Sequence, residues 1–143
     1  MTATLAIDDL HVVLAGRPRL PLLRGVSLAI APGEVRGLVG ESGAGKSMIG
    51  RAIFGLLPSR ARITRGTVAF DGRDLVAMPE RARRALLGRE IALIPQDPMT
   101  SLNPVKRIGE QVAAVLRLKL GLSRRTAWAR AGDLLGDVAI RDP

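Results

Sequence analysis

A short glycine-rich segment constrains the fold of this chain more than any other feature. It reads Gly40-Glu41-Ser42-Gly43-Ala44-Gly45-Lys46-Ser47 and follows an apolar run at 34–39. After it comes a stretch with helical spacing, from Lys46 to Leu57. Such a pattern is typical of a strand that leads through a tight loop into a helix. The sequence therefore predicts a strand over 34–39, a loop, and a helix that Pro58 ends.

The same segment predicts a site for the phosphates of a nucleoside triphosphate, with ATP expected. Its glycines allow backbone angles and a close approach that side chains would block, and the positive end of the helix then faces the anion. We expect Lys46 to reach the β- and γ-phosphates and the Ser47 hydroxyl to coordinate magnesium. A plain connecting turn would match the whole pattern by chance in about one such chain in a few hundred. The predicted nucleotide-binding residues are Gly40, Glu41, Ser42, Gly43, Ala44, Gly45, Lys46 and Ser47.

Composition restricts the other possibilities. The 143 residues suffice for one compact domain or a piece of one, and 47% hydrophobic with 24% charged residues is typical of a folded chain. No apolar run reaches the length of about 18 residues that a membrane span needs, and no secretory signal or cysteine is present. The cytoplasm is the default compartment. A net charge of +9 would suit nucleic acid, but two Phe and one Trp offer few stacking surfaces, so nucleic acid is a disfavoured partner.

Local patterns predict the remaining elements. Aliphatic or alternating runs bounded by turn residues predict strands within 3–14 and over 26–30, 66–70 and 91–94. Helical spacing and start signals predict helices over 79–87, from 105 onward and over 124–135. We interpret Trp128 as a residue that packs between helices. His11, the only histidine, is interpreted as a structural or surface residue because no carboxylate partner is evident.

Four stretches of the chain share a family resemblance. They lie at 23–28, 39–43, 94–104 and 134–143, and the third, Ile94-Pro95-Gln96-Asp97-Pro98-Met99-Thr100-Ser101-Leu102-Asn103-Pro104, is the most specific. Together they resemble the ATP-binding subunits of ABC transporters, in particular those of dipeptide and oligopeptide importers. The resemblance implies an α/β fold: a P-loop NTPase core with an N-terminal antiparallel β subdomain and the start of a helical subdomain. It assigns 1–104 to the β subdomain plus P-loop core and 105–143 to the helical subdomain.

The resemblance also implies roles for individual residues. In this family the glutamine that matches Gln96 reaches the magnesium and the attacking water, and its loop touches the membrane permease. Lys46 and Gln96 would then be catalytic, with Ser47 and Gln96 as magnesium ligands. ATP and Mg²⁺ would be the cofactors, and the partners would be a second nucleotide-binding domain and transmembrane permease subunits at the cytoplasmic face of the membrane. Leu14 stands where the family stacks adenine on an aromatic, which gives up roughly 1 kcal/mol or more of stacking energy.

Later motifs of the family are not found in the sequence. These are the Leu-Ser-Gly-Gly-Gln signature, the catalytic glutamate after an apolar strand, and the switch histidine. The resemblance therefore implies a truncated piece, the first half of a nucleotide-binding domain whose intact parent hydrolyses ATP to drive import of peptides. Alone, the chain is expected to bind nucleotide weakly and not to turn it over. Two other functions stay open. One is a soluble ABC-type ATPase that acts on nucleic acid or in regulation, against which the peptide-importer run after Gln96 argues. The other is a P-loop kinase or a GTPase, neither of which needs the Gln96 segment.

Overall fold

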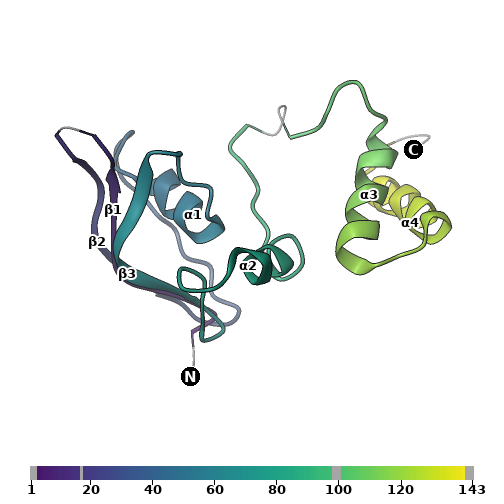
Figure 1. Ribbon diagram of the computed structural model, residues 1–143. Coiled ribbons are helices and arrows are strands. Elements are labelled where there is room, and N and C mark those ends of the chain that lie inside the picture. The colour runs from purple at the N-terminus through teal and green to yellow at the C-terminus, as the bar shows by residue number, and fades with distance from the viewer. Residues whose placement is uncertain (1–2, 17, 98–100, 141–143) are drawn as a thin grey trace. The chain divides into compact units, whose positions relative to one another are not determined.

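The computed structural model describes residues 3–16, 18–97 and 101–140 (Figure 1). The chain divides into two compact units, Met1–Arg83 and Arg84–Pro143, and each is described by itself below. A division into compact units does not by itself define subdomains, so the predicted subdomain boundary at 104 stays a prediction.

The first unit contains a four-stranded antiparallel sheet with the order β2-β1-β3-β4. Figure 1 labels its three long strands, β1, β2 and β3. Its strands are β1 (Leu5–Leu14), β2 (Leu20–Ile30), β3 (Ala61–Phe70) and β4 (Arg73–Asp74). Asp71 and Gly72 join β3 to β4 with φ angles of 45° and 74°, as a tight hairpin turn requires. The predicted strands within 3–14 and over 26–30 and 66–70 are confirmed, and so is the N-terminal antiparallel β subdomain.

The core of the first unit is built by the sheet and by helix α1 (Lys46–Phe54). Leu10, Val12 and Val68 are each 0% exposed, which places the middle of β1 and β3 at its centre. Ile49 and Ala52 of α1 are buried as well. The helix is shorter than predicted: it ends before Pro58 because Gly55 adopts a left-handed conformation with φ 64° and closes it.

The three long strands are all distorted at one level of the sheet. Asp9 of β1, Gly25 of β2 and Gly66 of β3 have φ angles of 45°, 68° and 91°, and the register of β1 shifts there against both neighbours. The Asp9 carboxylate lies 2.9 Å from Nε2 of His11 and 2.6 Å from Nε of Arg65. His11 therefore has the carboxylate neighbour that was not evident from the sequence. The contact is local to the bulge, which agrees with a structural role for His11.

Glu34 closes the turn that follows β2. Its carboxylate accepts a hydrogen bond of 2.7 Å from the Ala31 N–H and pairs with Arg36. The Ala31 N–H first, and then the Arg36 guanidinium, hold the pKa of Glu34 below its ordinary value. Because the folded pKa is lowered, this turn is stabilised above the ordinary pKa of a glutamate and loses that stabilisation as the pH falls through the folded value.

Two predicted strands are wrong. Residues 34–39 have no regular secondary structure, and 91–94 form only a single bridge, between Leu87 and Ile91. Val35, Val39 and Ile94 are 96%, 93% and 92% exposed, so these apolar runs are not covered by described residues. A strand needs a neighbouring strand for its backbone hydrogen bonds, and an apolar run does not itself supply one. Of the predicted strand, loop and helix, the loop and the helix are confirmed and the strand is not.

The second unit consists mainly of a helical hairpin. α3 (Ile108–Leu120) and α4 (Arg124–Asp137) pack through Ala113, Ala127 and Ala131, with larger apolar side chains around them. Gly121 ends α3 with φ 67°, and the Ser123 side chain accepts the Thr126 N–H at the start of α4. The helices predicted from 105 onward and over 124–135 are confirmed, although α3 begins only at Ile108. The short helix α2 (Glu80–Leu86) confirms the helix predicted over 79–87.

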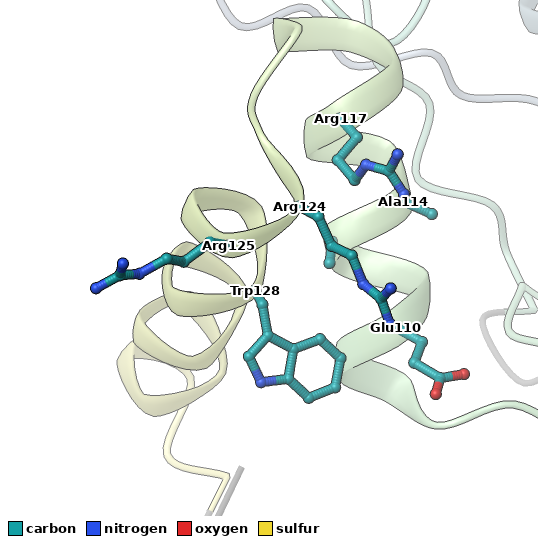
Figure 2. Close-up of a pocket in the computed structure, with 7 residues that line it drawn as sticks. Glu110, Ala114, Arg117, Arg124, Arg125 and Trp128 are labelled. Atoms are coloured by element: carbon teal, nitrogen blue, oxygen red, sulfur yellow. The ribbon is translucent and has the colours of Figure 1, made fainter.

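Trp128 lies on the outside of this hairpin, beside a hollow of about 850 Å³ (Figure 2). A Cβ on Gly109 of α3 would be 3.6 Å from Cη2 of the indole, so the ring packs on α3. The indole is nevertheless 52% exposed. Arginines from both helices share the hollow, and Arg125 points away from α3 in Figure 2. Packing between helices is thus the interpretation of Trp128 that its contacts support.

No helix in the described part of the chain is long and apolar enough to cross a membrane.

Candidate functional site

The predicted phosphate loop lies in the first unit and runs into the first turn of α1. Gly40, Gly43 and Gly45 adopt φ angles of 156°, 86° and 91°. These values lie in the region that glycine reaches without strain and that other residues rarely adopt. The Ala44 N–H donates to the Glu41 carbonyl at 3.2 Å, which closes a turn inside the loop. The glycines are therefore used for the backbone geometry that the sequence predicted.

Gly45 also lies in close contact with strand β2. A Cβ at this position would lie 2.9 Å from Cδ2 of Leu23 and 3.2 Å from the carbonyl oxygen of Leu22. Leu22 and Leu23 also border a cavity of about 460 Å³ together with Gly43 and Ala44. The first residues of β2 thus support the loop. Local patterns did not identify them, because the contact joins segments that are more than 20 residues apart.

Backbone donors gather at the start of α1. Gly45 is the N-cap residue, makes no side-chain capping bond, and no acidic residue lies in the first turn. Within the described residues, the N–H groups of Gly43, Gly45, Lys46 and Ser47 have no hydrogen-bond partner. Unpaired N–H groups at the positive end of a helix are the usual protein ligands of phosphate oxygens. The loop is therefore suited to a polyphosphate.

Lys46 adds a positive charge that is held in place. Its Nζ donates to the carbonyl oxygens of Gly40 and Glu41, at 2.6 Å each. An ammonium group has three N–H donors, so one is left without a partner among the described residues. The two carbonyls fix the ammonium against the start of the loop, and the third donor can then bind a ligand oxygen.

The predicted magnesium ligands lie in different units of the chain. Ser47 follows Lys46 in the first turn of α1, is exposed, and its hydroxyl makes no hydrogen bond within the described part of the chain. Gln96 is an exposed residue at a bend in the second unit, so its contact with the nucleotide stays a prediction. Residues 98–100 of the motif after it lie outside the described residues. No group of three acidic or imidazole side chains that could hold a metal ion occurs among residues with a described position.

A Mg²⁺–nucleotide complex fits these donors better than a free metal ion. Mg²⁺ is usually held by one or two protein oxygens together with substrate phosphates and water, which needs no cluster of carboxylates. The Ser47 hydroxyl and the cationic loop match that pattern. The donors of the loop are suited to phosphates and not to a nucleotide base. Leu14, the predicted adenine contact, ends β1 in register with Leu20 and Ala61. Its role toward adenine stays a prediction.

Sequence comparison agrees with this geometry. The family model described as ABC transporter matches residues 23–142, which is most of the chain. The chain belongs to the ABC transporter family.

Two relatives of the chain are named for peptide transport. The dipeptide transport ATP-binding protein DppD of Escherichia coli (strain K12) is 44% identical over 118 residues, which are 82% of this chain and 36% of that protein. The oligopeptide transport ATP-binding protein OppD of Salmonella typhimurium (strain LT2) is 39% identical over 137 residues, 95% of this chain and 41% of that protein. The predicted resemblance is confirmed. The chain spans well under half the length of these relatives.

A solved structure confirms the predicted fold class. It is the ATP-binding cassette MJ0796, a dimer in a post-hydrolysis state bound to ADP and Pi. The TM-score is 0.77 at 21% identity, and the match covers 96% of this chain and 58% of that chain. At this identity the likeness concerns the fold, which is that of an ABC nucleotide-binding domain.

Replacing Gly45 with alanine tests the loop geometry. The new methyl group would meet Leu23 and the Leu22 carbonyl in a backbone conformation with φ 91°, so the loop must shift and its N–H groups move with it. We expect MgATP binding, measured by isothermal titration calorimetry, to weaken by about tenfold or more. Gly50→Ala is the matched control, because a Cβ there meets nothing within 4 Å. Wild-type affinity in Gly45→Ala would show that the loop does not depend on this geometry.

Proposed function

We propose that this chain is the phosphate-binding part of an ATP-binding subunit that powers ABC-type transport, namely the import of peptides. One observation supports the proposal most strongly: unpaired backbone N–H groups at the start of α1 lie next to an ammonium group that two loop carbonyls hold in place. Membership of the ABC transporter family, together with the peptide transport for which DppD and OppD are named, supports the transport role.

The loop residues have separate roles in binding a triphosphate. The N–H groups of Gly43, Gly45, Lys46 and Ser47 bind phosphate oxygens, and the positive end of α1 favours their charge. The remaining Lys46 donor stabilises the negative charge that develops during phosphoryl transfer. Ser47 and Gln96 would hold Mg²⁺, which when bound neutralises and orients the phosphates. Gln96 is the residue that we assign to orienting the attacking water.

The partners follow from the same proposal. An ATP-binding subunit of a peptide importer acts with a second nucleotide-binding domain and with transmembrane permease subunits, at the cytoplasmic face of the membrane. ATP hydrolysis is assigned to the parent protein in that assembly. For the 143 residues themselves we propose binding without turnover, because their sequence contains neither the signature motif nor the catalytic glutamate of the family.

Two measurements on the purified 143-residue chain test this function. Calorimetry should detect binding of MgATP, and removal of Mg²⁺ with EDTA should weaken it, since the metal bridges the phosphates to the protein. A steady-state phosphate-release assay should detect no turnover. Absence of binding at millimolar MgATP would contradict the nucleotide-binding function. Magnesium-dependent phosphate release that Lys46→Ala abolishes would instead contradict the separation of binding from catalysis.

A further inference from the structure

The hollow beside Trp128 is formed by the two helices of the hairpin alone, within the second unit. Its volume of about 850 Å³ lies in the range of roughly 300 to 1,000 Å³ that is usual for small-molecule sites. Because the alanines that border it have short side chains, they leave space between the longer side chains on either side. The border residues of α3 recur every three or four positions and so share one face of the helix; they are Glu110, Ala113, Ala114 and Arg117.

Two arginines from different helices flank the hollow without a partner. Arg117 comes from the last turn of α3 and Arg124 from the start of α4. Figure 2 shows their guanidinium groups on the same side of α3, above and below Ala114 in that view. Neither group makes an ion pair or a hydrogen bond with a described residue. Each therefore keeps its five N–H donors for solvent or for a ligand.

The stability of α4 does not explain its basic start. Arg124 and Arg125 open the helix, and its first turn contains no acidic residue. The positive end of a helix favours negative charge, so two arginines at this end are unfavourable in the hairpin by itself. An anion in the hollow would offset that unfavourable charge.

An indole and a carboxylate form the other charged or aromatic borders of the hollow. Trp128 is 52% exposed, and no guanidinium of the described residues lies over its ring. Figure 2 shows the ring beside Glu110, whose carboxylate likewise makes no hydrogen bond or ion pair with a described residue. An exposed indole can stack on a planar ring, and a free carboxylate accepts hydrogen bonds from hydroxyl or amino groups. The hollow is thus suited to a ligand that has an anionic end, a planar ring and hydrogen-bond donors.

We propose that this hollow binds a nucleoside monophosphate, at a site separate from the phosphate loop. A phosphate monoester carries a charge of about −1.5 to −2 near pH 7, which matches the two guanidinium groups of Arg117 and Arg124. A carboxylate, with a single charge, would need only one of them. The base stacks on Trp128, and the sugar hydroxyls or an amino group of the base donate to Glu110. A nucleic-acid strand fits less well, because a single exposed ring can stack on only one base.

The fluorescence of Trp128 tests the site directly, because this residue is the only tryptophan of the chain. Titration of the 143-residue chain with AMP, without Mg²⁺, should quench the fluorescence and saturate at about millimolar concentration or below. Adenosine lacks the charge and inorganic phosphate lacks the ring, so each should bind about tenfold or more weakly, as measured by competition with AMP. Phenyl phosphate has a charge and a ring but no donors for Glu110, and it should also bind more weakly than AMP.

Substitutions of the arginines separate a specific site from general attraction by positive charge. Arg117→Gln and Arg124→Gln should each weaken AMP binding by about tenfold or more, because each removes charge-assisted hydrogen bonds. Arg125→Gln is the matched control: it removes the same charge at the same end of α4, but the Arg125 side chain points away from α3 in Figure 2. Its affinity for AMP should stay near the wild-type value. All three arginines are exposed, so helical circular dichroism should not change.

Three results would overturn this site. They are no saturable quenching by AMP, equal losses in Arg117→Gln and Arg125→Gln, and an affinity for inorganic phosphate or phenyl phosphate equal to that for AMP. The proposed function is followed separately, by the NMR shift of the Gly45 amide when MgATP is added. That shift should persist in Arg117→Gln, because the phosphate loop lies in the first unit. Failure of either site therefore leaves the other to be judged by its own signal.

Discussion

Replacing Lys46 with alanine is expected to weaken binding of MgATP on the order of 10- to 100-fold, the usual effect of losing a hydrogen bond to a charged group. The ammonium group serves the site in two ways. It offers a donor to the phosphates, and through its bonds to Gly40 and Glu41 it holds the start of the loop in place. Alanine removes both, so we expect a larger loss than for any other single side chain of the loop. Calorimetric titration with MgATP measures the effect.

Lys106→Ala is the control for this prediction. Each variant lowers the formal net charge from +9 to +8, but Lys106 lies in the second unit and outside the loop. Non-specific attraction of ATP to a basic protein would weaken equally in both variants and would fall steeply with added salt. A specific site predicts near wild-type binding by Lys106→Ala. Equal losses in the two variants would show that overall charge, and not the loop, attracts the nucleotide.

The start of α1 and the loop before it could be predicted because their signals are local. Glycines at 40, 43 and 45 are needed for backbone angles within the loop itself, and the helix begins at Lys46 as the pattern requires. The same holds for the hairpin of α3 and α4, whose break at Gly121 and capping residue Ser123 act over a few residues. Structure that depends on interactions within a few residues can be predicted from the sequence of those residues alone.

The predictions of strands over 34–39 and 91–94 were wrong because strand formation depends on a partner elsewhere in the chain. Val35, Val39 and Ile94 belong to apolar runs of suitable length, but a strand is defined by pairing with another strand, and the described residues provide no ladder there. An apolar run indicates that the segment prefers to be buried, but it does not identify the neighbouring strand that would pair with it.

Contacts of individual side chains could likewise not be predicted from the sequence. Leu23 lies against Gly45, yet no local pattern around Leu23 indicates this contact. The pairing of His11 with Asp9 depends on a bulge that sequence alone does not locate. The backbone geometry of the loop could thus be predicted from its own sequence, whereas its contact with Leu23 required the structure.

Gly66→Ala is expected to destabilise the first unit more than any other glycine substitution in the sheet. Gly66 faces the bulge of β1, and a Cβ there would overlap the backbone carbonyl oxygens of Asp8 and Asp9. Its φ of 91° adds conformational strain for any other residue. Backbone atoms in the middle of a sheet cannot move aside as a flexible side chain would, so strand pairing must break. We expect a loss of about 3 kcal/mol or more in the free energy of unfolding.

Gly72→Ala separates the overlap from the strain. Gly72 also has a positive φ, 74°, but a Cβ there meets nothing within 4 Å, so we expect a loss of only about 1 kcal/mol. Amide exchange of β1 and β3 residues measures the first unit. Trp128 fluorescence during urea unfolding follows the second unit, because this only tryptophan lies on α4. Gly66→Ala should accelerate exchange in the sheet and leave the tryptophan transition nearly unchanged. Equal effects of the two substitutions would show that the bulge at Asp9 yields to a methyl group, and that the sheet does not depend on the close approach of β3 to β1.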